Sequence, residues 1–143
     1  MIDINASIIP SKSLGGITLG KNIVDYQYFF DKYTVKYVQD AMFSVRYKFP
    51  DYHISISVDV RNGNIYKITA YNGYQGGMHG IFIGDAITKI PASFTYDDCD
   101  EGYISKKTEG IIIHTDIDDP LPEELIGAKI GEIAVFLPSV FKP

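Results

Sequence analysis

One stretch constrains the fold more than any other: residues 53–77, HISISVDVRNGNIYKITAYNGYQGG. Apolar and polar residues alternate on both sides of a central Asn-Gly pair, which is the pattern of two strands with one buried face each. The apolar residues before the turn are Ile54, Ile56, Val58 and Val60, and those after it are Tyr66, Ile68 and Ala70. The stretch therefore predicts a β-hairpin.

The length of the turn decides which side chains share a face. A two-residue Asn62–Gly63 turn would pair Val58 with Lys67 and mix the apolar and polar faces. We predict instead a three-residue loop, 61–63, with a type I turn and a bulge at Gly63, because glycine adopts the required left-handed conformation without steric cost. This register pairs Val58 with Tyr66, Ile56 with Ile68 and Ile54 with Ala70.

The rest of the chain predicts short helices and more strands. Asn22 is a plausible N-cap for a helix from about Ile23 to Tyr33, where apolar residues fall at helical spacing. Thr34–Met42 fits either a helix end or a strand. The predicted strands are Asp3–Ile9, Phe43–Phe49 (which completes a three-stranded meander to Tyr71), Phe94–Tyr96, Gly102–Lys106, Gly110–Thr115 and Ile130–Leu137.

A short motif occurs twice. Gly16–Ile23 and Gly80–Ile87 share the pattern G-I-x-[LI]-G-x-x-I, and in each case strand-like segments follow. We predict a single α+β domain over residues 1–143, with an antiparallel sheet, short helices on one face, and an internal duplication of a helix-plus-meander unit. The two pseudo-repeats span about residues 13–72 and 77–137.

Charge is unevenly distributed along the chain. The net charge is −5, with +2 in residues 1–90 and −7 in residues 91–143. An acidic half argues against nucleic-acid binding, which needs basic patches, and suits either a basic protein partner or simple solubility. The single cysteine, the lack of a basic and apolar leader, and the lack of a membrane-length apolar run predict a soluble, cytoplasmic protein with no membrane partner.

No combination of residues points to a reaction. Cys99 lies among four carboxylates, which disfavour a thiolate. The three histidines, His53, His79 and His114, match no zinc motif. Residues 15–22 have the glycine and lysine spacing of a phosphate-binding loop, but Asn22 stands where a hydroxyl is needed. We therefore predict no catalytic residue, no metal, no cofactor, and no enzyme.

Two kinds of residue are candidates for binding a partner. Two acidic loops could form one negative patch that meets a cationic cleft, and two loop tyrosines beside glycines could serve as anchors. The candidate partner-binding residues are Tyr71, Tyr74, Asp97, Asp98, Asp100, Glu101, Asp118 and Asp119. The alternative function is a small-ligand-binding domain that uses the Gly73–Gly80 loop as a lid.

A family resemblance adds to this interpretation. The segments Ser13–Gly20, Val58–Ile68, Tyr71–Tyr74 and Gly80–Gly84 look like those of small bacterial immunity proteins from polymorphic and contact-dependent toxin systems. The doubled turn-and-helix pattern also resembles the repeats of the β-lactamase-inhibitor-protein and outer-membrane-assembly lipoprotein class, although the lipobox cysteine of the lipoproteins is missing. The resemblance implies a protein that binds and neutralises a cognate, basic toxin domain without doing chemistry.

Overall fold

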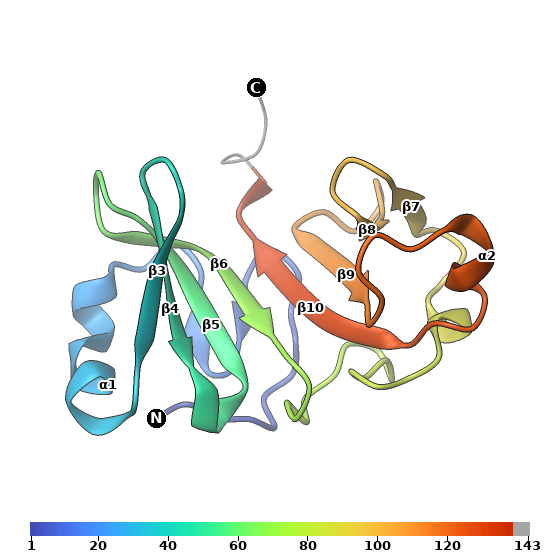
Figure 1. Ribbon diagram of the computed structural model, residues 1–143. Coiled ribbons are helices and arrows are strands. Elements are labelled where there is room, and N and C mark those ends of the chain that lie inside the picture. Colours follow the sequence, from blue (N-terminus) through green and yellow to red (C-terminus); the bar gives the residue numbers. More distant parts are fainter. Residues whose placement is uncertain (139–143) are drawn as a thin grey trace.

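A single antiparallel sheet of eight strands organises residues 1–138, which are the residues that the computed structural model describes (Figure 1). The spatial order is β3-β4-β5-β6-β10-β9-β8-β7. Two meanders that each run in chain order therefore meet through their last strands, β6 and β10. The bounds are β3 Lys36–Ala41, β4 Ser44–Phe49, β5 Ile54–Asp59, β6 Asn64–Ala70, β7 Thr95–Asp97, β8 Gly102–Ile104, β9 Ile111–Thr115 and β10 Ile130–Phe136.

The predicted hairpin is β5–β6, and its register is confirmed at two of three apolar pairs. Ile54 pairs with Ala70 and Ile56 with Ile68. Val58 does not pair with Tyr66 as predicted. It pairs with Ile65, because the loop is four residues long, 60–63, and the bulge lies at Tyr66.

Gly63 has the predicted left-handed conformation, with φ 79°, and no other residue of the 60–63 loop has a positive φ. Its N–H donates to the Asp59 carbonyl at 2.7 Å, as does the N–H of Asn62 at 3.3 Å. The bulge at Tyr66 shifts the alternation by one residue. Ile65 is therefore fully buried beside Ile68, and Tyr66 lies on the opposite face.

The N-terminal segment does not form the predicted strand Asp3–Ile9. Its backbone instead bonds to the loop after β6, where Gln75 N donates to Ile4 O and Ile8 N donates to Gly77 O. The strand prediction was wrong because these isoleucines fill the core without a neighbouring ladder. The segment continues into a small hairpin of β1, Ser13–Leu14, and β2, Ile17–Thr18.

The predicted helix at about 23–33 is confirmed as a 3₁₀ turn, η1 (Ile23–Tyr26), that continues into α1 (Gln27–Lys32). The Asn22 side chain accepts from Val24 N at 3.1 Å, which satisfies a backbone donor at the helix start. Phe29 on α1 is fully buried, and its ring meets that of Phe49 edge-on at 6.0 Å. The ambiguous segment after α1 is β3.

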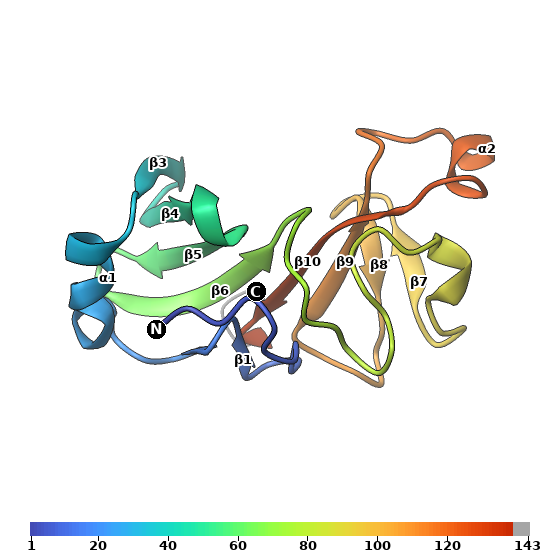
Figure 2. The ribbon, with the colours of Figure 1, turned by 90° about the horizontal axis from the view of Figure 1, so that it is seen from below.

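One face of the sheet carries the core. The N-terminal segment and β1 lie against this face, beneath β6 and β10 in Figure 2, whereas β3, β4 and the β9–β10 connection rise on the other side. Fully buried side chains on the core face include Leu14, Ile17, Phe49, Ile54, Ile56, Ile65, Ile68, Ile111, Ile113, Ile130 and Ile133. The other face, which no helix covers in Figure 1, is called the open face below.

The two halves hold their last strands through matching hydrogen bonds. In the first half, Gly20 N donates to Ile65 O, Ile65 N to Lys21 O, and Ile23 N to Gly63 O. The matching bonds in the second half are Gly84 N to Ile130 O, Ile130 N to Asp85 O, and Ile87 N to Ala128 O. The hydrogen bonds of the two halves are therefore equivalent in position. That the halves arose by duplication remains a prediction.

Three short helical turns complete the described chain: η2 (Pro50–Tyr52), η3 (Ile87–Lys89) and α2 (Pro122–Leu125). None of the helices within residues 1–138 is long and apolar enough to span a membrane.

Candidate functional site

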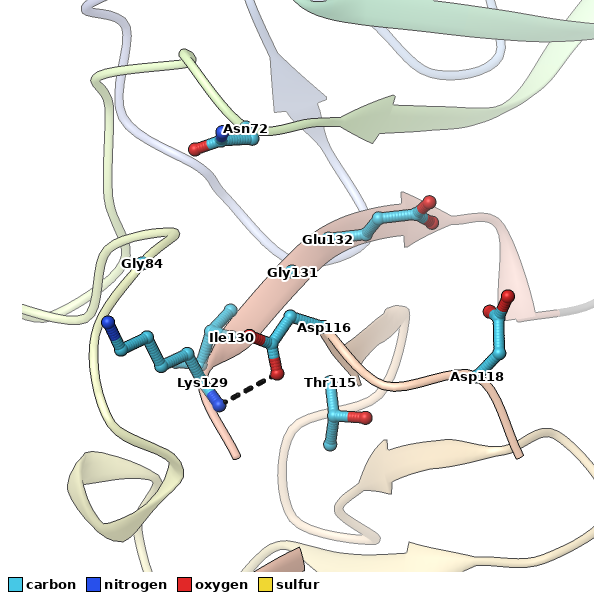
Figure 3. A pocket seen from close by; sticks show the side chains of 9 residues that line it. All are labelled: Asn72, Gly84, Thr115, Asp116, Asp118, Lys129, Ile130, Gly131 and Glu132. Carbon is cyan, nitrogen blue, oxygen red and sulfur yellow. Dashed lines mark hydrogen bonds between the residues drawn. The ribbon is translucent and has the colours of Figure 1, made fainter. Parts of the chain in front are cut away.

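A cavity of about 490 Å³ opens where the β9–β10 connection leaves the sheet. The end of β9 supplies Thr115, the connection supplies Asp116, Asp118 and Lys129, and β10 supplies Ile130, Gly131 and Glu132, while Asn72 and Gly84 come from two other loops (Figure 3). We call this space the acidic cavity, because three carboxylates and one ammonium line it.

The backbone at the base of the acidic cavity is held tightly. Asp116 N donates to Lys129 O at 2.8 Å, and Lys129 N donates to the Asp116 carboxylate at 3.0 Å (Figure 3). Gly131 is the bulged residue between β9 and β10. A Cβ atom there would come within 2.8 Å of Thr115 O, so only glycine allows this close approach.

The second acidic loop, 97–101, joins β7 to β8 and lies at the same end of the sheet. The pKa of Tyr96 on β7 is raised, chiefly by burial. The carboxylates of Glu101 and Asp98 raise this pKa further, and that of Asp119 does so more weakly. Asp98, Glu101 and Asp119 are all exposed. The carboxylates of Asp98 and Glu101 therefore act on the Tyr96 phenol, and Asp119 of the other acidic loop adds a weaker effect.

The β9–β10 connection also exposes apolar side chains that sequence reasoning missed. Leu121 is 56% exposed and Ile126 is 79% exposed, on either side of α2. Glu124 of α2 accepts from Leu121 N at 3.0 Å, which orders the start of this turn. Glu123 and Glu124 of α2 lie between these two apolar residues in the chain and are also exposed. No periodic pattern marks Leu121 and Ile126, which is why they were overlooked.

The remaining predicted residues lie elsewhere or face elsewhere. Asp97 accepts from the backbone N–H groups of Cys99 and Asp100 and so shapes the β7–β8 turn. Asp100 lines two cavities on the open face, and its carboxylate acts on Lys67. It therefore does not join the acidic groups around Tyr96.

The two predicted tyrosine anchors differ in exposure. Tyr71 is partly buried on the open face, where its hydroxyl lies 2.8 Å from Ser55 Oγ and its ring lies under the Lys48 ammonium. Tyr74 is only 4% exposed. Its hydroxyl accepts from Gly15 N at 2.9 Å and donates to Ala6 O at 2.6 Å. Tyr74 is thus a structural residue with almost no surface to offer a partner.

The Gly73–Gly80 loop packs into the fold and does not cover a cavity as a lid would. Gly76 N donates to Ile4 O at 3.0 Å, and a Cβ atom at Gly76 would overlap Ala6 O. Met78 is buried in the same region. This arrangement does not favour the alternative of a ligand lid.

The residues that could carry chemistry are scattered. Cys99 is exposed in the acidic loop, His79 is exposed in a turn, and His114 Nδ1 lies 3.0 Å from the Glu101 carbonyl oxygen. Within the described part of the chain, no three residues among His, Cys, Asp and Glu gather so as to hold a metal ion.

Comparison with known proteins gives one structural neighbour. No protein-family model matches the sequence, and no curated protein matches it. The fold is similar to the crystal structure of the uncharacterized protein yfeY from Escherichia coli, with a TM-score of 0.62 and 13% identity over 91% of this chain and 99% of that one. Similarity at this identity shows a shared fold alone, and the fold class is α+β with an antiparallel sheet, as predicted.

Proposed function

We propose that this protein is a non-enzymatic immunity protein, which binds and neutralises a cognate toxin domain. The observation that carries the proposal is that carboxylates from both acidic loops, those of Asp98 and Glu101 and more weakly that of Asp119, act on Tyr96 at one end of the sheet. Together with the acidic cavity and the exposed Leu121 and Ile126, this end of the sheet offers negative charge for steering and apolar groups for affinity.

The expected partner surface is basic. Arginine or lysine side chains of the toxin domain would enter the acidic cavity between Asp116, Asp118 and Glu132, because three carboxylates there face one ammonium. The β9–β10 connection, which contains α2, would sterically block the cleft of a toxin whose cleft is cationic. Fast association at low salt and slow dissociation are the kinetic signature of such an interface.

The test pairs affinity capture with neutralisation. Tagged wild-type protein is used to capture partners from its native cells at low salt, and the partner gene is then expressed in a naive host with and without this chain. The chain is expected to restore growth. The double variant Asp118→Lys/Asp119→Lys should bind about tenfold or more weakly, with slower and less salt-dependent association.

Asp31→Lys serves as the matched control, because Asp31 is an exposed carboxylate on α1, away from both acidic loops. It should bind and protect like the wild type. If the captured partner has no toxicity that this chain relieves, or if Asp118→Lys/Asp119→Lys protects as well as Asp31→Lys, the proposal is wrong.

A further inference from the structure

A row of polar side chains crosses strands β4, β5 and β6 on the open face. Arg46 of β4 is the register partner of Ser57 on β5, and Ser57 is the partner of Lys67 on β6. Register partners project from the same face, and adjacent strands lie about 4.8 Å apart. Thr69, two residues after Lys67, projects from that face in the next row.

Two hydroxyls, one in this row and one in the next, are buried without a hydrogen-bond partner. Ser57 is 1% exposed and Thr69 is 3% exposed, and neither Ser57 Oγ nor Thr69 Oγ1 has a partner among the described residues. The neighbouring Ser55 is equally buried, but its hydroxyl pairs with Tyr71. Buried hydroxyls are normally satisfied, so Ser57 Oγ and Thr69 Oγ1 retain the capacity to bind a further polar group.

The two cations on either side of Ser57 are incompletely neutralised. Arg46 Nε lies 3.3 Å from an Asp40 carboxylate oxygen, yet it makes no hydrogen bond of good geometry. Lys67 has no ion pair among the described residues. Burial lowers the pKa of Lys67, and Arg46 lowers it further, while the carboxylates of Glu132, Asp40 and Asp100 raise it. An anion between the two cations would relieve both the repulsion and the desolvation.

We propose that Arg46, Ser57, Lys67 and Thr69 form a binding site for the oxyanion group of a small molecule. The hydroxyls donate to the oxyanion, and the two cations balance its charge. A cavity of about 220 Å³ adjoins the row and is lined by Lys67, Ile104, Ile112 and Phe136, with Asp100 and His114 at its polar side. The apolar part of such a ligand would lie there. Phosphate, sulfate and carboxylate groups all share this chemistry.

The test is a titration of the full-length protein at constant ionic strength with three probes: inorganic phosphate, acetate and phenyl phosphate. Backbone amide NMR shifts locate the binding. Saturable shifts centred on residues 57, 67 and 69 are expected. Phosphate stronger than acetate would identify a tetrahedral oxyanion, and the reverse order a carboxylate. Phenyl phosphate should bind more tightly than phosphate if the adjoining cavity takes the apolar part.

Two variants decide whether the row is responsible. Ser57→Ala/Thr69→Val removes both hydroxyls with little change in shape, and Lys67→Met removes one charge. Each should weaken binding by about tenfold or more, because each removes hydrogen bonds or a charge that the oxyanion would use. Lys12→Met is the control, since Lys12 is an exposed lysine of the N-terminal segment. Absence of saturable binding by all three probes, or equal binding by all variants, would overturn the proposal.

Discussion

The two halves of this protein share a framework and differ in what they attach to it. In both, a glycine turn bonds to the start of the last strand, and a bulge follows one residue later, at Tyr66 in the first half and at Gly131 in the second. The hairpin before that strand closes with four residues, 60–63, in the first half and with residues 116–129 in the second. The longer connection carries α2, the exposed apolar groups and much of the acidity.

The same comparison extends to the open face. The first register pair beyond the bulge is Ser57–Lys67 in one half and His114–Glu132 in the other. Equivalent backbone positions thus carry opposite charge. The buried isoleucines and turn glycines form the framework that the two halves share, whereas the halves differ in the connection and in the outward-facing positions of the strands.

Truncation of the two framework isoleucines tests the equivalence most strongly. Ile65 and Ile130 are 0% and 1% exposed and occupy matching positions. Ile65→Ala and Ile130→Ala should each lower the free energy of unfolding by about 2–5 kcal/mol, the usual cost of such a cavity. Urea denaturation measures both. A difference of several kcal/mol between them would break the comparison.

The hydroxyl of Tyr74 ties the loop after β6 to the N-terminal segment. Its removal should lower the free energy of unfolding by less than the isoleucine truncations do. Tyr74→Phe leaves Gly15 N and Ala6 O without their partner, so a loss of about 1–3 kcal/mol is expected. Burial raises the pKa of Tyr74 from 10.0 to about 12. The unfolded chain therefore releases this proton first as the pH rises.

The pH dependence follows from that order. The contribution of Tyr74 to wild-type stability should be independent of pH below pH 10 and should fall as the pH rises from 10 to about 12. Tyr74→Phe should lack this part of the decline. Urea melts of both proteins across this range provide the measurement, and parallel curves would show that Tyr74 ionises equally easily in the folded state.

The Gly131→Ala substitution tests whether the two bulges have the same backbone geometry. Tyr66 carries a large side chain at its bulge, but a Cβ atom at Gly131 would meet Thr115 O at 2.8 Å. A cost of about 1–3 kcal/mol is expected from the strain. The control is Gly127→Ala, where no atom lies within 4 Å of the added methyl group. A harmless Gly131→Ala would mean that the bulges are interchangeable.

Shortening the β9–β10 connection should change stability even less. Replacing residues 117–127 with a short glycine-containing turn makes the second half more like the first. The free energy of unfolding should move by about 1 kcal/mol at most, because closure entropy depends weakly on loop length. The partner binding that we propose should disappear. Retained binding would place the interface outside this connection.

The smallest effect is expected from Lys67→Met. It removes a cation that is partly desolvated and repelled by Arg46, and its long apolar replacement can lie beside Phe136. The free energy of unfolding should stay within about 0.5 kcal/mol of the wild type. A large loss of stability would indicate that Lys67 is needed for folding. The opposite charges of Lys67 and Glu132 would then reflect different structural roles.

Alternation in the sequence predicted the strands well because period two depends only on neighbouring residues. Ile54 and Ile56 lie in the predicted register for this reason. The bulge at Tyr66 was missed because it needs one extra residue that the alternation itself does not mark. Asp3–Ile9 was wrongly predicted as a strand because burial without strand pairing produces a similar composition.

The sequence predicted that the candidate site is acidic, but it predicted the positions of only some of its residues. Asp98, Glu101, Asp118 and Asp119 are exposed at one end of the sheet, as loops rich in carboxylates suggest. Tyr74 could not be placed, because a glycine-flanked tyrosine looks the same in sequence whether its ring turns inward or outward. The pairing of Arg46, Ser57 and Lys67 depends on register across three strands, which no local pattern specifies.

The join between β6 and β10 has a consequence for folding. Within each meander, strands pair with neighbours in the chain, whereas Ile133 pairs with Ala70 from the other half. Contacts between distant residues require the larger entropy loss before they form. Each meander should therefore assemble as its own cooperative unit, and the join should close last. In native-state hydrogen exchange, the amides that pair β6 with β10 should therefore exchange through an opening that separates the two meanders and leaves each of them folded.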